Sequence, residues 1–199
     1  KALMQQLLTG KKRLHDQNGQ PFTGEWMKIH LRDVLNEEKQ RNKNNHEQLV
    51  LSVTNHSGFV LPEEQFSKRV ASDNVENYKV VKKGNFGYNP SRINVGSFAR
   101  LDDYDSGLLS PMYVVFSIDE TRLNSDLFLN WMKSNEATQR IKNSVQGSVR
   151  ESVGFDALCS FPFKLPPIEE QQKIAAVLNA ADNEIDTLKQ KLDHLKQEK

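Results

Sequence analysis

The 199-residue sequence is poor in cysteine and in long apolar runs. Cys159 is the only cysteine, which excludes a disulfide within the chain and a cysteine-rich zinc site. No apolar run approaches the length that crosses a membrane, and the first residues have the pattern of an amphipathic helix end rather than a signal peptide. We therefore expect this chain in a reducing cytoplasm.

An excess of charge of one sign is also missing. The sequence has 27 Lys and Arg against 26 Asp and Glu, a net charge of +1, and a pI near 8.0. Proteins that bind nucleic acid through overall basicity have a much larger surplus of positive charge. A DNA-binding surface on this chain therefore has to come from local patches of basic residues.

Motifs that carry catalysis or bind cofactors are absent as well. The sequence has no phosphate loop of the form G-x-x-x-x-G-K-[ST], and no glycine-rich loop follows a strand in a way that would hold a methyl donor. Asn89-Pro90-Ser91-Arg92 lacks the second proline and the aromatic residue of an adenine-methyltransferase motif. Cys159 lies beside Leu158 and Phe161, which favours a buried apolar role. We predict a protein without catalysis, cofactor or metal site of its own.

The most regular feature that is present is a heptad repeat at the C-terminal end. From Pro166 onward, apolar residues recur at alternating steps of four and three, which is the seam of a coiled coil. If Lys1 followed Lys199 directly, Leu3 and Leu7 would continue this seam, so we expect a segment of a protein with an internal repeat. With no partner helix beside it, the seam should be exposed. Its members are Ile174, Leu178, Ala181, Ile185, Leu188, Leu192 and Leu195.

Between these ends, the pattern predicts several strands with short helices. Strands are expected at residues 49–53 and 78–81, within 93–98, and once or twice within 108–116, and helical spacing covers 123–135. Residues 82–90 read as a turn between strands. The expected fold class is α+β: a mixed globular domain followed by a long coiled-coil helix.

Two segments at the ends of the chain resemble a known family. Leu165–Ala175, which reads LPPIEEQQKIA, resembles the entry to the long helix in specificity subunits of type I DNA restriction–modification enzymes. Leu3–Leu14 resembles the exit from that helix. Weaker matches between them extend the resemblance over nearly the whole chain, at residues 26–34, 78–81, 84–86, 88–89, 92–94, 107–111, 113–116 and 147–148.

The resemblance implies an organisation and a set of partners. In this family the chain carries two target-recognition domains, each followed by a long helix, and the two helices pair as an antiparallel spacer. It implies residues 1–20 as a helix end and linker, 21–165 as a recognition domain, and 166–199 as the spacer helix. Partners would be double-stranded DNA, methyltransferase subunits that use S-adenosylmethionine and, through them, restriction subunits that use ATP. The spacer would pair with a second recognition domain's helix or with a second copy of this chain.

Two segments offer side chains suited to DNA. Around the turn at 82–90, cations can neutralise phosphates, while Asn and Arg can form bidentate hydrogen bonds with base edges. The candidates there are Lys82, Lys83, Tyr88, Arg92 and Asn94. A solvated hairpin, whose Tyr and Asn serve only the turn, explains the same residues. A third polar segment, with Lys39, Arg41, Lys43, Asn44, Asn45 and His46, has the same ambiguity.

The second segment contains no carboxylate between Arg140 and Arg150. We expect Arg140, Lys142 and Arg150 to contact phosphates, and Gln146 or Ser148 to lie near base edges. An exposed helix end with a basic linker is the structural alternative. The function predicted for the whole chain is sequence-specific recognition of one half of a bipartite DNA target. The alternative is a coiled-coil scaffold for protein interaction that does not read DNA.

Overall fold

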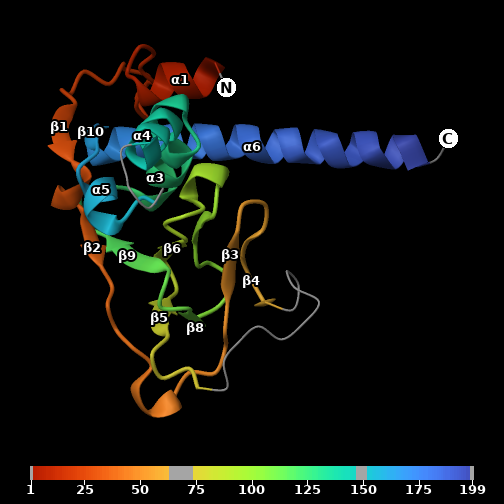
Figure 1. The fold of residues 1–199 in the computed structure, drawn as a ribbon. Coiled ribbons are helices and arrows are strands. Elements are labelled where there is room, and N and C mark those ends of the chain that lie inside the picture. The colour runs from red at the N-terminus through yellow and green to blue at the C-terminus, as the bar shows by residue number, and fades with distance from the viewer. Residues whose placement is uncertain (1, 63–73, 147–151, 198–199) are drawn as a thin grey trace. The chain divides into compact units, whose positions relative to one another are not determined.

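The structure, a computed structural model, describes residues 2–62, 74–146 and 152–197 (Figure 1). The chain folds into two compact units, each assembled from segments that are distant in sequence. The helical unit consists of the described parts of Lys1–Lys28, Glu120–Asn135 and Lys164–Lys199. The β unit consists of the described parts of Ile29–Asp119 and Glu136–Phe163.

The helical unit is built from three helices: α1 (Ala2–Leu8), α3 (Ser125–Met132) and α6 (Ile168–Gln197). The asparagine Asn124 caps α3, because its side chain accepts a hydrogen bond from the Leu127 amide at 2.9 Å. Leu127, Phe128 and Trp131 form the buried face of α3. Figure 1 shows α1 and α3 beside the first half of α6, while the second half of α6 extends beyond them.

A buried glutamine fixes the entry to α6. Gln171 has no exposed surface, and its side-chain amide donates to the carbonyls of Arg122 and Pro166, each at 2.8 Å. Its carbonyl oxygen accepts from the backbone amide of Asn124 at 2.8 Å. One side chain in the first turn of α6 thus holds the loop that leads into α3.

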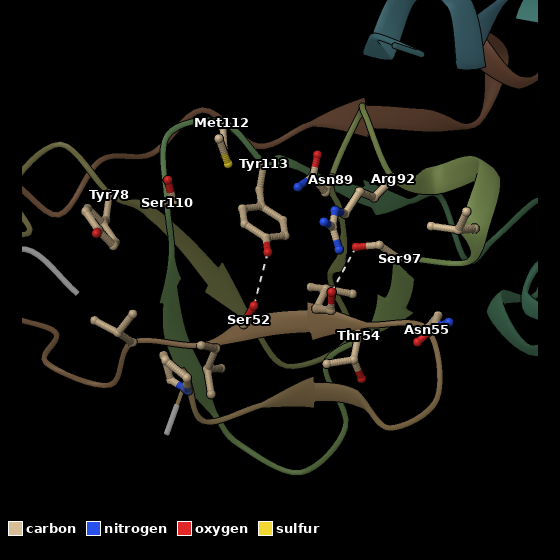
Figure 2. Close-up of a pocket in the computed structure, with 15 residues that line it drawn as sticks. Ser52, Thr54, Asn55, Tyr78, Asn89, Arg92, Ser97, Ser110, Met112 and Tyr113 are labelled. Atoms are coloured by element: carbon tan, nitrogen blue, oxygen red, sulfur yellow. Dashed lines mark hydrogen bonds between the residues drawn. The ribbon is translucent and has the colours of Figure 1, made fainter. Parts of the chain in front are cut away.

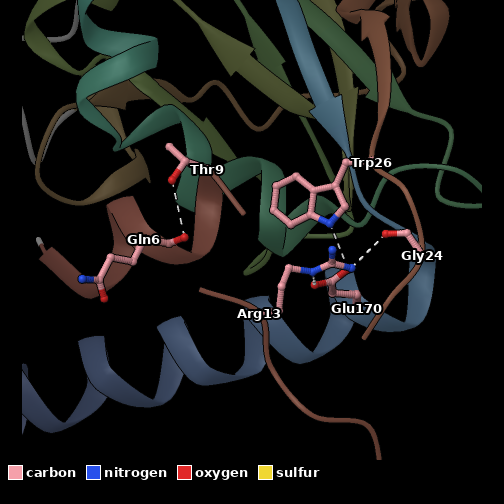
Figure 3. Close-up of polar contacts among 6 residues, drawn as sticks. All are labelled: Gln6, Thr9, Arg13, Gly24, Trp26 and Glu170. Atoms are coloured by element: carbon pink, nitrogen blue, oxygen red, sulfur yellow. Dashed lines mark hydrogen bonds and ion pairs between the residues drawn. The ribbon is translucent and has the colours of Figure 1, made fainter. Parts of the chain in front are cut away.

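The neighbouring residue Glu170 is also fully buried and is paired (Figure 3). Arg13 approaches it with two nitrogens, at 2.6 Å from Oε1 and 2.8 Å from Oε2. The indole of Trp26 donates to Oε2 at 2.9 Å, and the Arg13 guanidinium lies over the Trp26 ring. The segment PPIEEQ therefore has a structural role, because its Glu and Gln join the start of α6 to residues far away in sequence.

The heptad seam divides into a covered part and an exposed part. Ile174 and Leu178 are buried, so the prediction of a fully exposed seam was wrong for them. The physical reason is that α1 and α3 pack on the first half of α6. Beyond Ala181 the seam is exposed as predicted, at 49–60% for Ile185, Leu188, Leu192 and Leu195. At the standard rise, the 30 residues of α6 span about 45 Å.

The β unit contains a four-stranded antiparallel sheet and two strand pairs. The order in the sheet is β2 (Leu35–Glu37), β9 (Val114–Ile118), β6 (Phe86–Tyr88), β7 (Phe98–Arg100). The hairpin β3 (Ser52–Thr54) with β4 (Gly58–Val60) and the pair β5 (Lys79–Lys82) with β8 (Ser106–Leu109) accompany it. The chain also forms α4 (Asn135–Gln146), α5 (Phe155–Cys159), the short 3-10 helices Leu31–Asp33, Lys43–Asn45 and Ile93–Val95, and the pair β1 (Met27–His30) with β10 (Pro162–Leu165).

Strand alternation gives the sheet two different buried faces. Phe86 stacks on Phe116 at 5.2 Å between ring centroids, in a cluster with Tyr88, Phe98 and Phe155. On the opposite face, Gly87 lies between its strand partners Val115 and Ala99, which belong to the aliphatic core. A Cβ atom at Gly87 would come within 2.8 Å of both Leu109 and Phe59, so only glycine fits there without repacking.

Most predicted elements are present, with two corrections. The strand at 78–81 is β5, the apolar stretch 108–116 contains parts of β8 and β9, and the helical stretch 123–135 contains α3. Residues 82–90 are not a single turn, because they include β6. Residues 93–95 form a 3-10 helix rather than a strand, which leaves Val95 59% exposed, and β7 begins at Phe98.

The functional domain predicted at 21–165 does not coincide with either compact unit, because α3 groups with α6.

Replacing Gln171 tests how the entry to α6 is held. Gln171→Ala removes three hydrogen bonds, one of them buried and two partly buried, so we expect the free energy of unfolding to fall by about 3 kcal/mol. Gln172→Ala is the matched control, because Gln172 is exposed on the same helix turn and its loss should change little. Urea unfolding followed by circular dichroism measures both. Equal stabilities of the two variants would contradict this role of Gln171.

Candidate nucleic-acid interface

The predicted hairpin residues lie at the two ends of β6. β5 pairs with β8, whereas β6 pairs with β7 and β9, so Lys82–Asn85 connects two different strand groups and does not close a hairpin. Lys82 and Lys83 precede β6, while Arg92 and Asn94 follow it. Because a strand advances about 3.3 Å per residue, the three residues of β6 separate these groups by roughly 10 Å.

The first group lies against an acidic loop. The Lys83 amide donates to the Asp105 carbonyl and the Gly84 amide to the Leu101 carbonyl, both at 2.8 Å. This neighbouring loop carries Asp102, Asp103 and Asp105, all exposed. Lys82 and Lys83 are exposed, but the carboxylates of Asp103 and Asp105 nearby weaken the positive potential that a phosphate would meet. Asp102 is already paired with Arg100 at 2.7 Å.

The second group follows a compact turn. The Asn89 side chain accepts from the Ser91 amide at 3.0 Å, and its carbonyl accepts from the Arg92 amide at 2.9 Å. Gly96 closes the turn with a φ of +96°, a conformation that favours glycine. Arg92 and Asn94 are exposed, and no hydrogen bond or ion pair from the Arg92 guanidinium is found among the described residues. This end of β6 therefore presents an accessible cation on a fixed turn.

Tyr88 does not belong to this surface. It has no exposed area and lies in the aromatic cluster with Phe98 and Phe116. Burial raises the pKa of its hydroxyl, which is therefore neutral at any ordinary pH. The predicted contact between Tyr88 and DNA is corrected, because the residue supports the sheet from inside.

A pocket opens beside Arg92 in the β unit (Figure 2). Its volume is about 520 Å³, and it is bounded by β3, by the turn that follows β6, by the segment between β8 and β9, and by Pro62 and Tyr78. Figure 2 shows Arg92 and Asn89 on one side, facing the ring of Tyr113. No pattern in the sequence indicated this pocket, because these segments are far apart in the chain. Its labelled lining residues are Ser52, Thr54, Asn55, Tyr78, Asn89, Arg92, Ser97, Ser110, Met112 and Tyr113.

Hydrogen bonds fix the walls of the pocket. The hydroxyls of Ser52 and Tyr113 are 3.1 Å apart, and Ser97 donates to the Val53 carbonyl at 2.8 Å. The ammonium of Lys79 donates to the Tyr113 carbonyl at 2.6 Å, and burial lowers the pKa of this lysine. Tyr113 is thereby held at its hydroxyl and at its backbone.

The second predicted segment is only partly within the described residues. Arg140 pairs with Glu136 one helix turn earlier, at 2.7 Å, so its charge is partly used within α4. Lys142 and Gln146 are exposed on α4. Ser148 and Arg150 lie outside the described residues. The Val153 amide donates to the Pro90 carbonyl at 3.0 Å, which brings the chain that follows this segment to the turn bearing Arg92.

The third polar segment is engaged in local contacts. Lys39 pairs with Glu37 at 2.9 Å, and Arg41 donates to the Asn77 carbonyl at 2.6 Å. Asn44 and Asn45 have positive φ values of 70° and 53°, as asparagine does in tight turns. Lys43 and His46 remain exposed. These contacts favour the structural interpretation of this segment.

The described residues contain no group of three or more His, Cys, Asp or Glu placed to hold a metal ion. Within the same residues, no helix is both long and apolar enough to span a membrane.

Comparison with known proteins now decides the family. The model of the type I restriction modification DNA specificity domain matches residues 23–197. The chain belongs to this family. It is a family of DNA specificity domains, and the match confirms the predicted family. No curated protein sequence matches the chain.

Solved structures share the fold at low sequence identity. One comes from a study of complex assembly and conformational transition of the type I R-M system, with a TM-score of 0.63 and 16% identity, over 83% of this chain and 44% of that chain. The HsdS subunit from Thermoanaerobacter tengcongensis gives 0.55 and 17%, over 95% and 44%. The S subunit from M. genitalium gives 0.57 and 12%, over 98% and 49%. The α+β fold is confirmed, and this chain spans less than half of each of these proteins.

The single cysteine tests the packing of the β unit. Cys159 is 7% exposed, and burial raises the pKa of its thiol to about 11. At pH 8 we expect it to react with a disulfide reagent at least about 100-fold more slowly in the folded protein than in urea, because the thiolate is the reacting form. The rate should rise with pH toward 11. Equal rates in folded and unfolded protein would show an accessible, ordinary thiol.

Proposed function

We propose that this chain is one DNA-recognition half of a type I specificity subunit and binds one half of a bipartite target. The observation that carries the proposal is the extent of the family match, which runs through the globular part and the long helix together, from residue 23 to residue 197. In this proposal the β unit reads the DNA, and the exposed half of α6 joins the recognition half to its partner.

The proposed partners are double-stranded DNA and the methyltransferase subunits, with restriction subunits bound through them. The chain directs methylation and cleavage, and the partner subunits perform both reactions. One structural relative comes from a study of complex assembly in the type I R-M system, which supports partners of this kind. A scaffold that does not read DNA is disfavoured, because the matched family is one of DNA specificity domains.

The DNA surface that we propose is centred on the turn that follows β6. Arg92 and Asn94 are exposed there, and the chain just beyond the basic segment is bonded to the same turn. Lys142 is a phosphate contact and Gln146 lies near base edges, together with the predicted contacts Arg150 and Ser148. Arg140 contributes less because Glu136 holds it, and Lys82 and Lys83 contribute less because of the aspartates beside them.

The exposed half of α6 is proposed as the spacer. Ile185, Leu188, Leu192 and Leu195 form an apolar stripe that a partner helix would cover, supplied by a second recognition domain or by a second copy of this chain. The helix spans about 45 Å, which exceeds one turn of DNA, about 34–36 Å. Two recognition domains held by such helices can contact the same face of a duplex.

Binding at several salt concentrations tests DNA recognition. In the assembled complex, Lys142→Ala should weaken binding to every duplex alike and reduce the slope of log affinity against log salt by about 0.9, the value for one lost phosphate contact. Arg140→Ala is the matched control on the same helix, and its effect should be smaller because Arg140 is already paired with Glu136. Fluorescence anisotropy with target and scrambled duplexes measures both changes.

Two outcomes would count against the proposal. If the complex bound target and scrambled duplexes equally, the chain would not be a specificity element. If target binding were specific but Lys142→Ala left the salt slope unchanged, the proposed surface on α4 would be wrong while the function stood.

Insertions in α6 test the spacer. Four residues inserted after Leu188 add about 6 Å and break the heptad phase, so the spacing between the half-targets should change by about two base pairs, or the helix pair should fail to form. An insertion of seven residues keeps the phase and should lengthen the spacing by about three base pairs with assembly intact. Selection from random duplexes reads the spacing. An unchanged spacing in a complex that still assembles would show that α6 is not the spacer.

A further inference from the structure

The pocket beside Arg92 has the chemistry of a site for a planar heteroaromatic ring. We propose that it receives one base of the bound DNA, drawn out of the stack, and that this base is part of the target that the chain reads. The inference rests on the proposed function and names a ligand group for a pocket within the recognition surface.

The size and form of the pocket suit such a group. Its volume of about 520 Å³ lies within the range of about 300–1,000 Å³ typical of sites for small ligands. One wall is made by Leu51 and Val53, which are buried in the aliphatic core, so the pocket is backed by a packed structure. A base is small enough to enter it, whereas a stacked base pair within a duplex is not presented to a concave site.

Apolar and aromatic groups at the rim provide surfaces for stacking. Met112 and Val95 line the pocket, although 65% and 59% of their surfaces are exposed to water. Tyr78 and Tyr113 add aromatic faces, and Tyr113 is held in place through its hydroxyl and its carbonyl. Stacking on aromatic side chains is the usual means by which proteins hold unpaired bases.

The polar groups of the lining match the edge of a base. Among the described residues that line the pocket, Arg92 is the single charged one, and none of them carries a carboxylate. A cationic ligand would therefore find no negative side chain in this lining, and a free polyanion would find only one positive side chain, Arg92. The Arg92 guanidinium and the amides of Asn55 and Asn89 are donors and acceptors of the kind that pair with base edges. Figure 2 shows Arg92 and Asn89 turned toward the Tyr113 ring, across the space that the base would occupy.

The energetics give a test that does not require knowing the base. Extruding a base from a duplex costs a few kcal/mol for the lost pairing and stacking, and the cost is lowest when the base is already mismatched. A mismatch at the extruded position, made by changing only the opposite base, should therefore tighten binding. At every other position a mismatch gives no such gain.

The experiment is a mismatch scan of the half-target with the assembled complex. Each base in turn is kept while its partner is replaced, on both strands, and affinity is measured by competition against the paired duplex. Apart from the base that the methyltransferase subunits extrude for modification, we expect one position at which the mismatch tightens binding several-fold, while an abasic site in place of the retained base weakens binding. Arg92→Ala and Met112→Ala should each reduce the gain from the mismatch, whereas Lys82→Ala, an exposed cation at the other end of β6, should keep it.

Each outcome decides the proposal. Specific binding to the paired duplex without any position of tighter mismatch binding would overturn the base pocket and leave the proposed function standing. A gain that persists in both Arg92→Ala and Met112→Ala would place the extruded base elsewhere and would also overturn it. If Arg92→Ala abolishes binding, Met112→Ala decides alone. Loss of sequence-specific binding by the unmodified complex would remove the function and this inference together.

Discussion

The arrangement of the helical unit depends on two buried polar side chains in the first turn of α6. A buried carboxylate is stable only when it is paired, and Glu170 is paired with Arg13 through two nitrogens and with the Trp26 indole. Gln171 satisfies three backbone groups of the loops around it. Because these bonds are directional, they fix where α1 and the loop before α3 lie on α6. A purely apolar contact would hold the helices together without fixing their rotation and translation.

The consequence of this anchor is a helix with two different halves. The half that carries Ile174 and Leu178 is covered by α1 and α3, while the half that carries Leu188 and Leu195 has no cover among the described residues. A covered half with an exposed apolar continuation suits the spacer role proposed for α6. Within the β unit, Gly87 lets the sheet pack closely on its aliphatic core, while the turn that follows β6 carries Arg92 to the surface.

Local periodicity predicted the long helix, and the resemblance predicted the family. The heptad indicated α6 and its exposed stripe, and the segment LPPIEEQ indicated the family, although only the structure shows which groups its Glu170 and Gln171 contact. The cover over Ile174 was missed, because α1 and α3 come from distant parts of the chain. The sequence alone does not reveal the burial of Tyr88, because a tyrosine next to an asparagine suits both a turn and a core, and its strand partners Phe98 and Val114 lie 10 and 26 residues further along the chain. Local pattern also contained no signal for the pocket, because its walls come from segments that are far apart in the chain.

The most direct test of the central claim is an exchange of the recognition domain. The β unit, residues 29–119 and 136–163, would be replaced by the corresponding residues of a family member with a different target, with the helical unit retained. The methylated sequence would then be determined in cells that contain the complete restriction–modification complex. If this chain reads one half of the bipartite target, that half changes to the donor's, while the other half stays the same. An unchanged methylated sequence, produced by a complex that contains the exchanged domain, would contradict this role.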